Sequence, residues 1–105
     1  MLVDSHCHLD FPDFAEDFDG VMSRAAEAGV GVIQTICTRL SKFGDVLALA
    51  RAHDNLYCSV GIHPHNVDDE PPATVEILID HARADEVIGI GETGLDYFYD
   101  YGPRA

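Results

Sequence analysis

The sequence predicts an α/β fold in which four parallel β-strands alternate with three α-helices. The first observation is the alternation itself, because four short apolar segments are separated by three stretches with helical periodicity. The second is the composition of the 105 residues, of which 47% are hydrophobic and 24% charged, as in folded globular domains. Strands joined through helices run parallel, because each connection crosses back over the sheet.

The first 36 residues contain two predicted strands and the helix between them. Residues 1–5 are a short apolar opening that we interpret as the first strand. Residues 13–28 have apolar side chains at steps of three and four, which predicts an amphipathic helix that ends at Gly29. The apolar positions of this helix are Phe14, Phe18, Val21, Met22 and Ala25. Residues 30–36 are apolar and rich in β-branched side chains, which indicates a strand covered on both faces.

A second helix and a third strand follow. Ser41 is a suitable N-cap for the helix, and Asp54 and Asn55 end it. Its predicted buried face consists of Phe43, Val46, Leu47 and Ala50. Residues 56–61 form the third strand, in which alternate side chains point to opposite faces. The apolar face, expected toward the helices, consists of Leu56, Cys58, Val60 and Ile62. The other face carries Tyr57, Ser59, Gly61 and His63, and the small residues among them leave room below the His63 imidazole.

The last predicted helix opens with Pro71 and Pro72, since proline is favoured in the first turn of a helix. We expect its buried side to consist of Val75, Leu78, Ile79 and Ala82. Residues 87–91 form the fourth strand. Strict alternation would place Ile88 and Ile90 on the same face as Glu92.

Two architectures have this order of elements: an open doubly wound sheet and a (β/α)₈ barrel. No G-x-G-x-x-G motif follows the first strand, which disfavours the dinucleotide-binding form of the open sheet. A whole barrel needs roughly 200 residues or more. Residues 1–105 would supply the N-terminal half of a TIM-like barrel, with two parallel strand edges left unpaired. We therefore expect residues 1–105 to be a single partial domain.

Charge and cysteine content limit the partners and the compartment. Six Lys and Arg residues against nineteen Asp and Glu give a formal net charge of −13, so most of the surface repels phosphates. A phosphate substrate has to be held locally, by metal ions or a few cations. The three cysteines form no C-x-x-C pair, which favours reduced thiols and a cytoplasmic location. No apolar run is long enough for a membrane span, and no obligate protein partner is inferred.

Ionisable side chains gather where three of the predicted strands end. His6 and His8 follow the first strand with side chains on the same face, and two such imidazoles can converge on one cation. His63 and His65 follow the third strand, and Glu92 follows the fourth. The carboxyl ends of parallel strands share one rim, where α/β proteins build their sites. The pattern predicts a metal site at this rim.

Three residues near the predicted site each allow two interpretations. Asp4 shares the face of His6 and would either accept a hydrogen bond from a ligand imidazole or be a structural carboxylate. Arg39 follows the second strand at the same rim and would either contact a phosphate or be an exposed residue at a helix start. Asp96 would either brace the loop that carries Glu92, and so act on a ligand indirectly, or hold a local turn.

Three segments of the chain resemble the successive signatures of the TatD-type metal-dependent deoxyribonucleases, which belong to the amidohydrolase-like barrels. They are residues 2–10 (LVDSHCHLD), 61–65 (GIHPH) and 91–97 (GETGLDY). They occur in the order of that family, at the ends of the first, third and fourth predicted strands. The resemblance covers essentially the whole chain and implies a TIM-like barrel that hydrolyses phosphodiester bonds in DNA with metal-activated water.

The resemblance also implies roles for individual residues. His6 and His8 would bind the first metal, Glu92 would bridge the first and the second, and Glu92 and His63 would be catalytic. His63 and His65 would face the substrate phosphate. The family takes two further histidines and an aspartate from later strands, so two metals are expected only in the full-length enzyme. Mg²⁺ is favoured, and Zn²⁺, Mn²⁺ or Co²⁺ also suit this donor set.

Two alternatives stay open. A related barrel hydrolase would cleave an amide or ester bond, for example in aminoacyl-tRNA, with the same metal-activated water. A truncated, non-catalytic module would keep the metal site without turnover. Assays with DNA ends and with aminoacyl esters separate the two enzymes.

Overall fold

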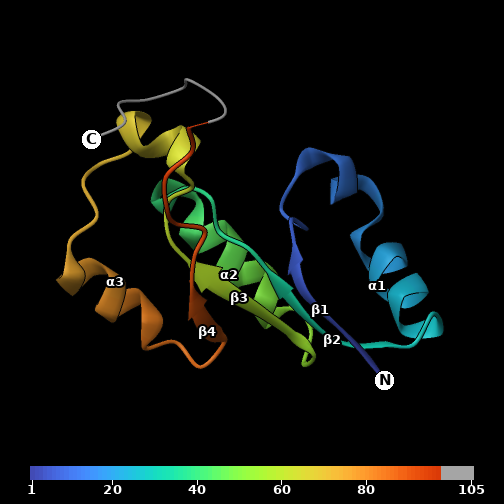
Figure 1. Ribbon diagram of the computed structural model, residues 1–105. Coiled ribbons are helices and arrows are strands. Elements are labelled where there is room, and N and C mark those ends of the chain that lie inside the picture. Colours follow the sequence, from blue (N-terminus) through green and yellow to red (C-terminus); the bar gives the residue numbers. More distant parts are fainter. Residues whose placement is uncertain (98–105) are drawn as a thin grey trace.

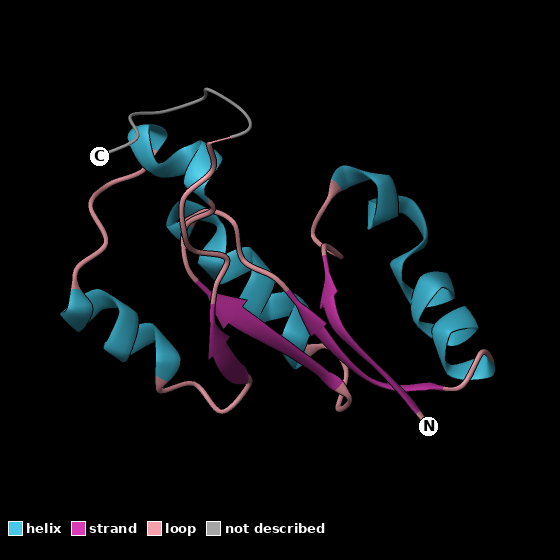
Figure 2. Ribbon diagram, viewed as in Figure 1, coloured by secondary structure: helices cyan, strands magenta, loops and turns pink. Residues whose placement is uncertain are grey.

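The computed structural model describes residues 1–97. These residues form one four-stranded parallel sheet in the order β1-β2-β3-β4, with the helices spread around it (Figure 1). The strands are β1 (Leu2–Cys7), β2 (Val30–Thr35), β3 (Leu56–Val60) and β4 (Val87–Ile90), and the helices are α1 (Phe18–Glu27), α2 (Phe43–Arg51) and α3 (Val75–Ala82). The prediction of four parallel strands alternating with helices is confirmed. The carboxyl ends of all four strands point toward the same end of the sheet (Figure 2).

The helices begin at other residues than the sequence predicted, because short 3₁₀ helices precede α1 and α2. Pro12–Asp17 is a separate 3₁₀ helix, so α1 begins at Phe18 and not at residue 13. Ser41 lies inside the 3₁₀ turn Leu40–Lys42, and its side chain makes no cap bond to α2. The two prolines lie before α3, and Thr74 caps that helix instead, with its Oγ1 accepting a hydrogen bond from the Ile77 N–H at 3.2 Å. The first turn of a helix has unpaired backbone N–H groups. A threonine hydroxyl can accept a hydrogen bond from one of them, whereas a proline ring has no acceptor atom.

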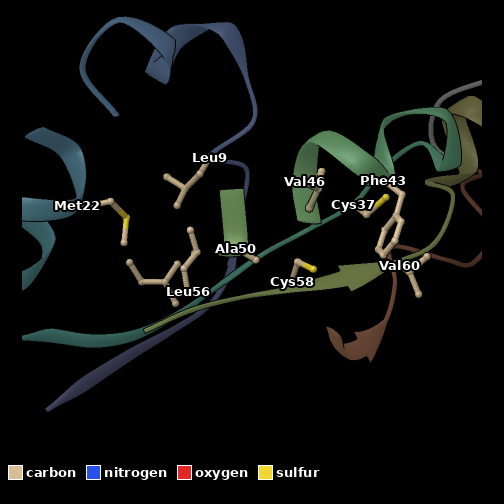
Figure 3. Packing of buried hydrophobic residues seen from close by; sticks show 10 residues of the cluster. Leu9, Met22, Cys37, Phe43, Val46, Ala50, Leu56, Cys58 and Val60 are labelled. Atoms are coloured by element: carbon tan, nitrogen blue, oxygen red, sulfur yellow. The ribbon is translucent and has the colours of Figure 1, made fainter. Parts of the chain in front are cut away.

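The core lies between the sheet and the helices α1 and α2 (Figure 3). Its buried apolar side chains are Leu9, Met22, Ile33, Cys37, Phe43, Val46, Ala50, Leu56, Cys58 and Val60. The predicted alternation of β3 is confirmed at Leu56, Cys58 and Val60, which all lie in this core. Among residues 1–97, the polar residues that are buried as a whole are Thr35 and Ser59. Within residues 1–97, no helix is both long enough and apolar enough to cross a membrane.

The opposite flank, α3 with β4, is far more exposed. Val75 and Ile79 are 69% and 50% exposed, so the prediction that they are buried is wrong, whereas Leu78 and Ala82 pack partly against the core. The reason is position, because β4 is an edge strand among the described residues.

The predicted orientation of β4 is also wrong. An irregularity opposite Cys58 and Ser59 shifts the register, so that Ser59 pairs with Gly89 and Val60 pairs with Ile90. Paired residues in a parallel sheet point to the same side, so Ile90 lies on the helix side with Val60. Ile90 there lines a cavity together with Leu78 of α3.

Candidate metal centre

The end of β1 brings two imidazoles to the rim of the sheet. His6 is in the strand and His8 follows it, and the intervening Cys7 packs against the core on the other side. Successive side chains of a strand point to opposite faces, so this alternation follows from the backbone. The two rings meet edge to face, with centroids 5.2 Å apart.

Glu92 completes a three-residue cluster with these imidazoles. Its Oε2 lies 3.6 Å from Nε2 of His6 and 3.6 Å from Nε2 of His8. Each residue offers one ligand atom, and the three ligand atoms lie within 4.8 Å of one another. Tetrahedral coordination at about 2.1 Å would place ligand atoms roughly 3.4 Å apart. The donor set and its spacing therefore fit a divalent cation.

One buried ring nitrogen adds to this fit. His8 Nδ1 is inaccessible to solvent and has no hydrogen-bond partner among residues 1–97. A neutral imidazole carries its proton on one nitrogen and keeps a lone pair on the other. With the proton on Nδ1, Nε2 of His8 offers a lone pair toward Glu92 and the space between them. The ring is held in this orientation by Phe11, which stacks on it with centroids 4.7 Å apart.

The backbone around Glu92 is anchored to the neighbouring strands. The Glu92 N–H donates to the Cys37 carbonyl at 2.9 Å, and the Gly91 N–H donates to the Val60 carbonyl at 2.9 Å. A Cβ on Gly61 would lie 2.7 Å from the Glu92 carbonyl oxygen, so this close approach requires glycine. The predicted small face of β3 therefore makes room for the backbone of Glu92 as well as for His63.

His63 lies next to Glu92, with Nε2 at 3.3 Å from Oε1 of the carboxylate. Its Nδ1 accepts a hydrogen bond from the His65 N–H at 3.1 Å. The neutral ring therefore carries its proton on Nε2, where it is directed at the carboxylate. This places His63 as a hydrogen-bond donor beside the three-residue cluster.

Asp96 contacts His65, a partner that neither interpretation of the sequence had named. Asp96 Oδ2 lies 2.5 Å from His65 Nε2, and the His65 ring meets that of His63 with centroids 4.3 Å apart. The carboxylate thus orients one of the two imidazoles that follow β3.

Asp4 and Arg39 lie near the rim but contact other groups. Asp4 Oδ1 accepts from the backbone N–H of His6 at 3.1 Å, so the carboxylate steadies the strand that carries the ligand. Arg39 Nη1 lies 3.8 Å from Glu70 Oε2. Ser41 donates to Glu70 through its N–H at 2.7 Å and its hydroxyl at 2.8 Å. The hydrogen bond from the Ser41 N–H, with Arg39 nearby, holds the pKa of the Glu70 carboxyl below its ordinary value.

A cavity of about 300 Å³ adjoins the cluster. It is lined by His8, Phe11, Thr38, His63, His65, Asn66 and Glu92. Sequence reasoning missed three of these residues. Asn66 Nδ2 donates to the Thr38 carbonyl at 3.3 Å, and the His63 N–H donates to the same carbonyl at 2.9 Å, which joins the loops after β2 and β3. Phe11 has no periodic pattern, and only its place just after the H-x-H pair could have indicated it.

Cys7 lies between the two imidazoles in sequence but is not part of the cluster. Burial, with smaller contributions from Asp4 and Asp10, raises the pKa of its thiol to about 11. Its Sγ donates to the Gln34 carbonyl at 3.5 Å and its side chain packs against the core, so it points away from the two imidazoles.

Comparisons with known proteins agree with the sequence motifs. The profile of the family described as "TatD related DNase" matches residues 3–105. The crystal structure of YjjV, a TatD homologue from Escherichia coli K12, superposes with a TM-score of 0.80 and 36% identity, over 94% of this chain and 39% of that one. The E. coli K12 protein "Uncharacterized metal-dependent hydrolase YjjV" is 40% identical over 100 residues, which are 93% of this chain and 39% of the relative.

A relative with a named substrate is the "3'-5' ssDNA/RNA exonuclease TatD" of Shigella flexneri serotype 5b. It is 35% identical over 96 residues, which are 91% of this chain and 37% of the relative. The chain therefore spans about two fifths of the length of the relatives that it matches. It corresponds to their N-terminal portion.

Proposed function

This chain belongs to the TatD-related DNase family, and from that premise we propose that it carries the first metal site of a hydrolase that cleaves phosphodiester bonds in DNA. The observation that supports the proposal is the convergence of two imidazole nitrogens and one carboxylate oxygen at separations of 3.6 Å. These groups come from opposite edges of the sheet, β1 and the loop after β4, and no local sequence pattern brings them together.

His6, His8 and Glu92 would hold the cation, with Mg²⁺ favoured and Zn²⁺, Mn²⁺ or Co²⁺ compatible. When bound, the cation would lower the pKa of a water molecule and so supply hydroxide at neutral pH. It would also stabilise the attacking and leaving oxygens of an in-line displacement. Glu92 also has a second oxygen, Oε1, directed at His63. In the longer enzyme this second oxygen would hold a second cation, so that the carboxylate would bridge the two. Two cations are proposed for the longer enzyme.

The remaining residues of the cavity would hold the substrate. The proton on His63 Nε2, which is directed at Glu92 Oε1 in this structure, would turn to a phosphate oxygen when substrate binds, and Asp96 orients the neighbouring His65 toward the same cavity. Arg39 would contact a more distant phosphate, with Glu70 holding its guanidinium. With a net charge of −13, the surface offers no broad attraction for a duplex. A single-stranded DNA end, held locally at this cavity, is the substrate that we propose.

The metal site is tested by Mn²⁺ titration of the chain, followed by isothermal calorimetry. We expect Glu92→Gln to weaken binding by more than about tenfold, because it removes a charged ligand and leaves the fold intact. Glu86→Gln is the matched control. The Glu86 side chain is 28% exposed, against 26% for Glu92, but Glu86 lies just before β4 and pairs with Arg51 of α2. Equal affinities in wild type and Glu92→Gln would contradict the site.

The substrate is tested separately, by fluorescence anisotropy with a labelled single-stranded DNA oligonucleotide. We expect Mg²⁺ to increase the affinity, and His6→Ala to abolish the increase. An aminoacyl ester that competes with the oligonucleotide, or is hydrolysed in its place, would favour the ester-cleaving alternative. Metal binding without any DNA binding would favour the non-catalytic module.

A further inference from the structure

The buried hydroxyl of Ser59 links β3 to the residues that follow β2 and β4. Ser59 is 2% exposed and lies in β3, between β2 and β4. Its Oγ donates to the Gly91 carbonyl at 2.7 Å and accepts from the Cys37 N–H at 3.1 Å. The Ser59 hydroxyl is thus both a hydrogen-bond donor and an acceptor, and its bond with the Cys37 N–H is buried.

These bonds close a ring around the backbone of Glu92. The Gly91 carbonyl belongs to the peptide group whose nitrogen is that of Glu92, and this nitrogen donates to the Cys37 carbonyl at 2.9 Å. The Cys37 N–H in turn donates to Ser59. The peptide group before Glu92 is therefore held through both of its polar atoms, one by Ser59 and one by Cys37. Cys37 is itself fully buried, so the ring cannot shift without repacking the core.

Holding this peptide group matters because it places the backbone of Glu92 beside Cys37, after β2, from where the side chain reaches the imidazoles that come from the neighbouring β1. Its carboxylate has to lie 3.6 Å from these two imidazoles. A small rotation at the backbone of Glu92 is enlarged at the end of a side chain with three rotatable bonds. The contact with Gly61 limits movement on one side, and nothing else among the described residues bonds the Gly91 carbonyl.

We propose that Ser59 is a positioning residue of the metal centre, which holds the Glu92 carboxylate opposite His6 and His8 through the Gly91 carbonyl. The inference rests on the proposed function, because it concerns the cation that this function requires. Loss of a group that orients a ligand weakens metal affinity by about 10–100-fold. The sequence marked Ser59 only as a small residue below His63, whereas the structure connects it to Glu92.

The test compares Ser59→Ala with Val46→Ala. Val46 is fully buried in α2, has no side-chain hydrogen bond, and controls for a general loss of stability. Ser59→Ala is expected to weaken Mn²⁺ binding by about tenfold or more and to change the visible absorption of bound Co²⁺ toward that of Glu92→Gln. Val46→Ala is expected to lower Tm but to keep the wild-type affinity and spectrum.

A metal-free readout completes the design. Amide hydrogen exchange at Glu92 and Cys37 is expected to accelerate in Ser59→Ala and to stay unchanged in Val46→Ala. If Ser59→Ala does not fold, Ser59→Cys keeps a weak donor of similar size, and an affinity between those of wild type and Glu92→Gln is expected. The inference is wrong if a folded Ser59 variant keeps the wild-type metal affinity and amide exchange, or if Val46→Ala loses as much metal affinity as Ser59→Ala. Either result would leave the proposed function standing. A wild-type chain that binds neither Mn²⁺ nor Co²⁺ would overturn the proposed function and the inference with it.

Discussion

The helices α2 and α3 have similar sequence patterns and opposite environments. Both are short and amphipathic, with an acidic residue in the first turn and a basic one in the last. In α2 the apolar face is buried, at Phe43, Val46 and Ala50. In α3, no residue is buried by the part of the chain that the structure describes.

The difference lies in the neighbours of each helix. α2 packs on β3 in the middle of the sheet, whereas α3 packs on β3 and the edge strand β4 (Figure 1). Amphipathic periodicity predicts that one face of a helix is apolar, but it does not predict how much of that face another element covers. The comparison teaches that helix formation is local, while burial depends on the elements placed beside the helix.

The largest expected effect is on the α2 side. Phe43 is 5% exposed, and its ring also contacts His81 of α3 with centroids 4.4 Å apart. Phe43→Ala is expected to lower the free energy of unfolding by about 3–5 kcal/mol, because it removes buried apolar area and leaves a cavity. Urea denaturation measures the change. A loss below about 1 kcal/mol would show that the α2 face is covered no better than that of α3.

A smaller effect is expected from the thiols, all three of which pack in or against the core. Burial is the main cause of the high pKa of the Cys58 thiol, which is raised from its ordinary value to about 11. Between pH 9 and pH 11 the unfolded chain loses this proton while the folded chain keeps it, so stability falls as the pH rises. Urea titrations across this range measure the slope. Cys58→Ala is expected to reduce the slope and leave the part due to Cys7 and Cys37, and an unchanged slope would contradict the assignment.

The smallest expected effect is on the α3 side. Ile79 is 50% exposed, and we expect Ile79→Ala to change the free energy of unfolding by at most about 0.5 kcal/mol. The same denaturation experiment as for Phe43→Ala provides the measurement, so the two helices are compared directly. A loss above about 2 kcal/mol would mean that another surface covers this face in solution.

Periodicity and turn residues were sufficient to predict the strands and helices, but not their first residues. The helix predicted to start at residue 13 begins at Phe18, because a 3₁₀ helix precedes it. The predicted face of β4 failed for a different reason. The register shift beside Ser59 turns Ile90 to the helix side, and strict alternation does not include such irregularities.

The grouping of the candidate site followed from one rule of parallel sheets. Because the carboxyl ends of parallel strands share a rim, His6, His8, His63 and Glu92 could be expected together before any coordinates were known. The partners of Asp96 and Arg39 could not be predicted. Their carboxylate and guanidinium groups reach residues about thirty positions away in the sequence, and those contacts depend on how the loops after β3 and β4 pack.

The sequence by itself determined the family, the order of the elements and the residue types that gather at the rim. These depend on local propensity, on alternation along a strand and on motif identity, which are all properties of short segments. Only the tertiary structure decided that the hydroxyl of Ser59 bonds the Gly91 carbonyl, that the apolar face of α3 stays exposed and that Asp96 contacts His65. These depend on register, on neighbouring elements and on side-chain reach, because hydrogen bonding and burial act between segments that are distant in the sequence.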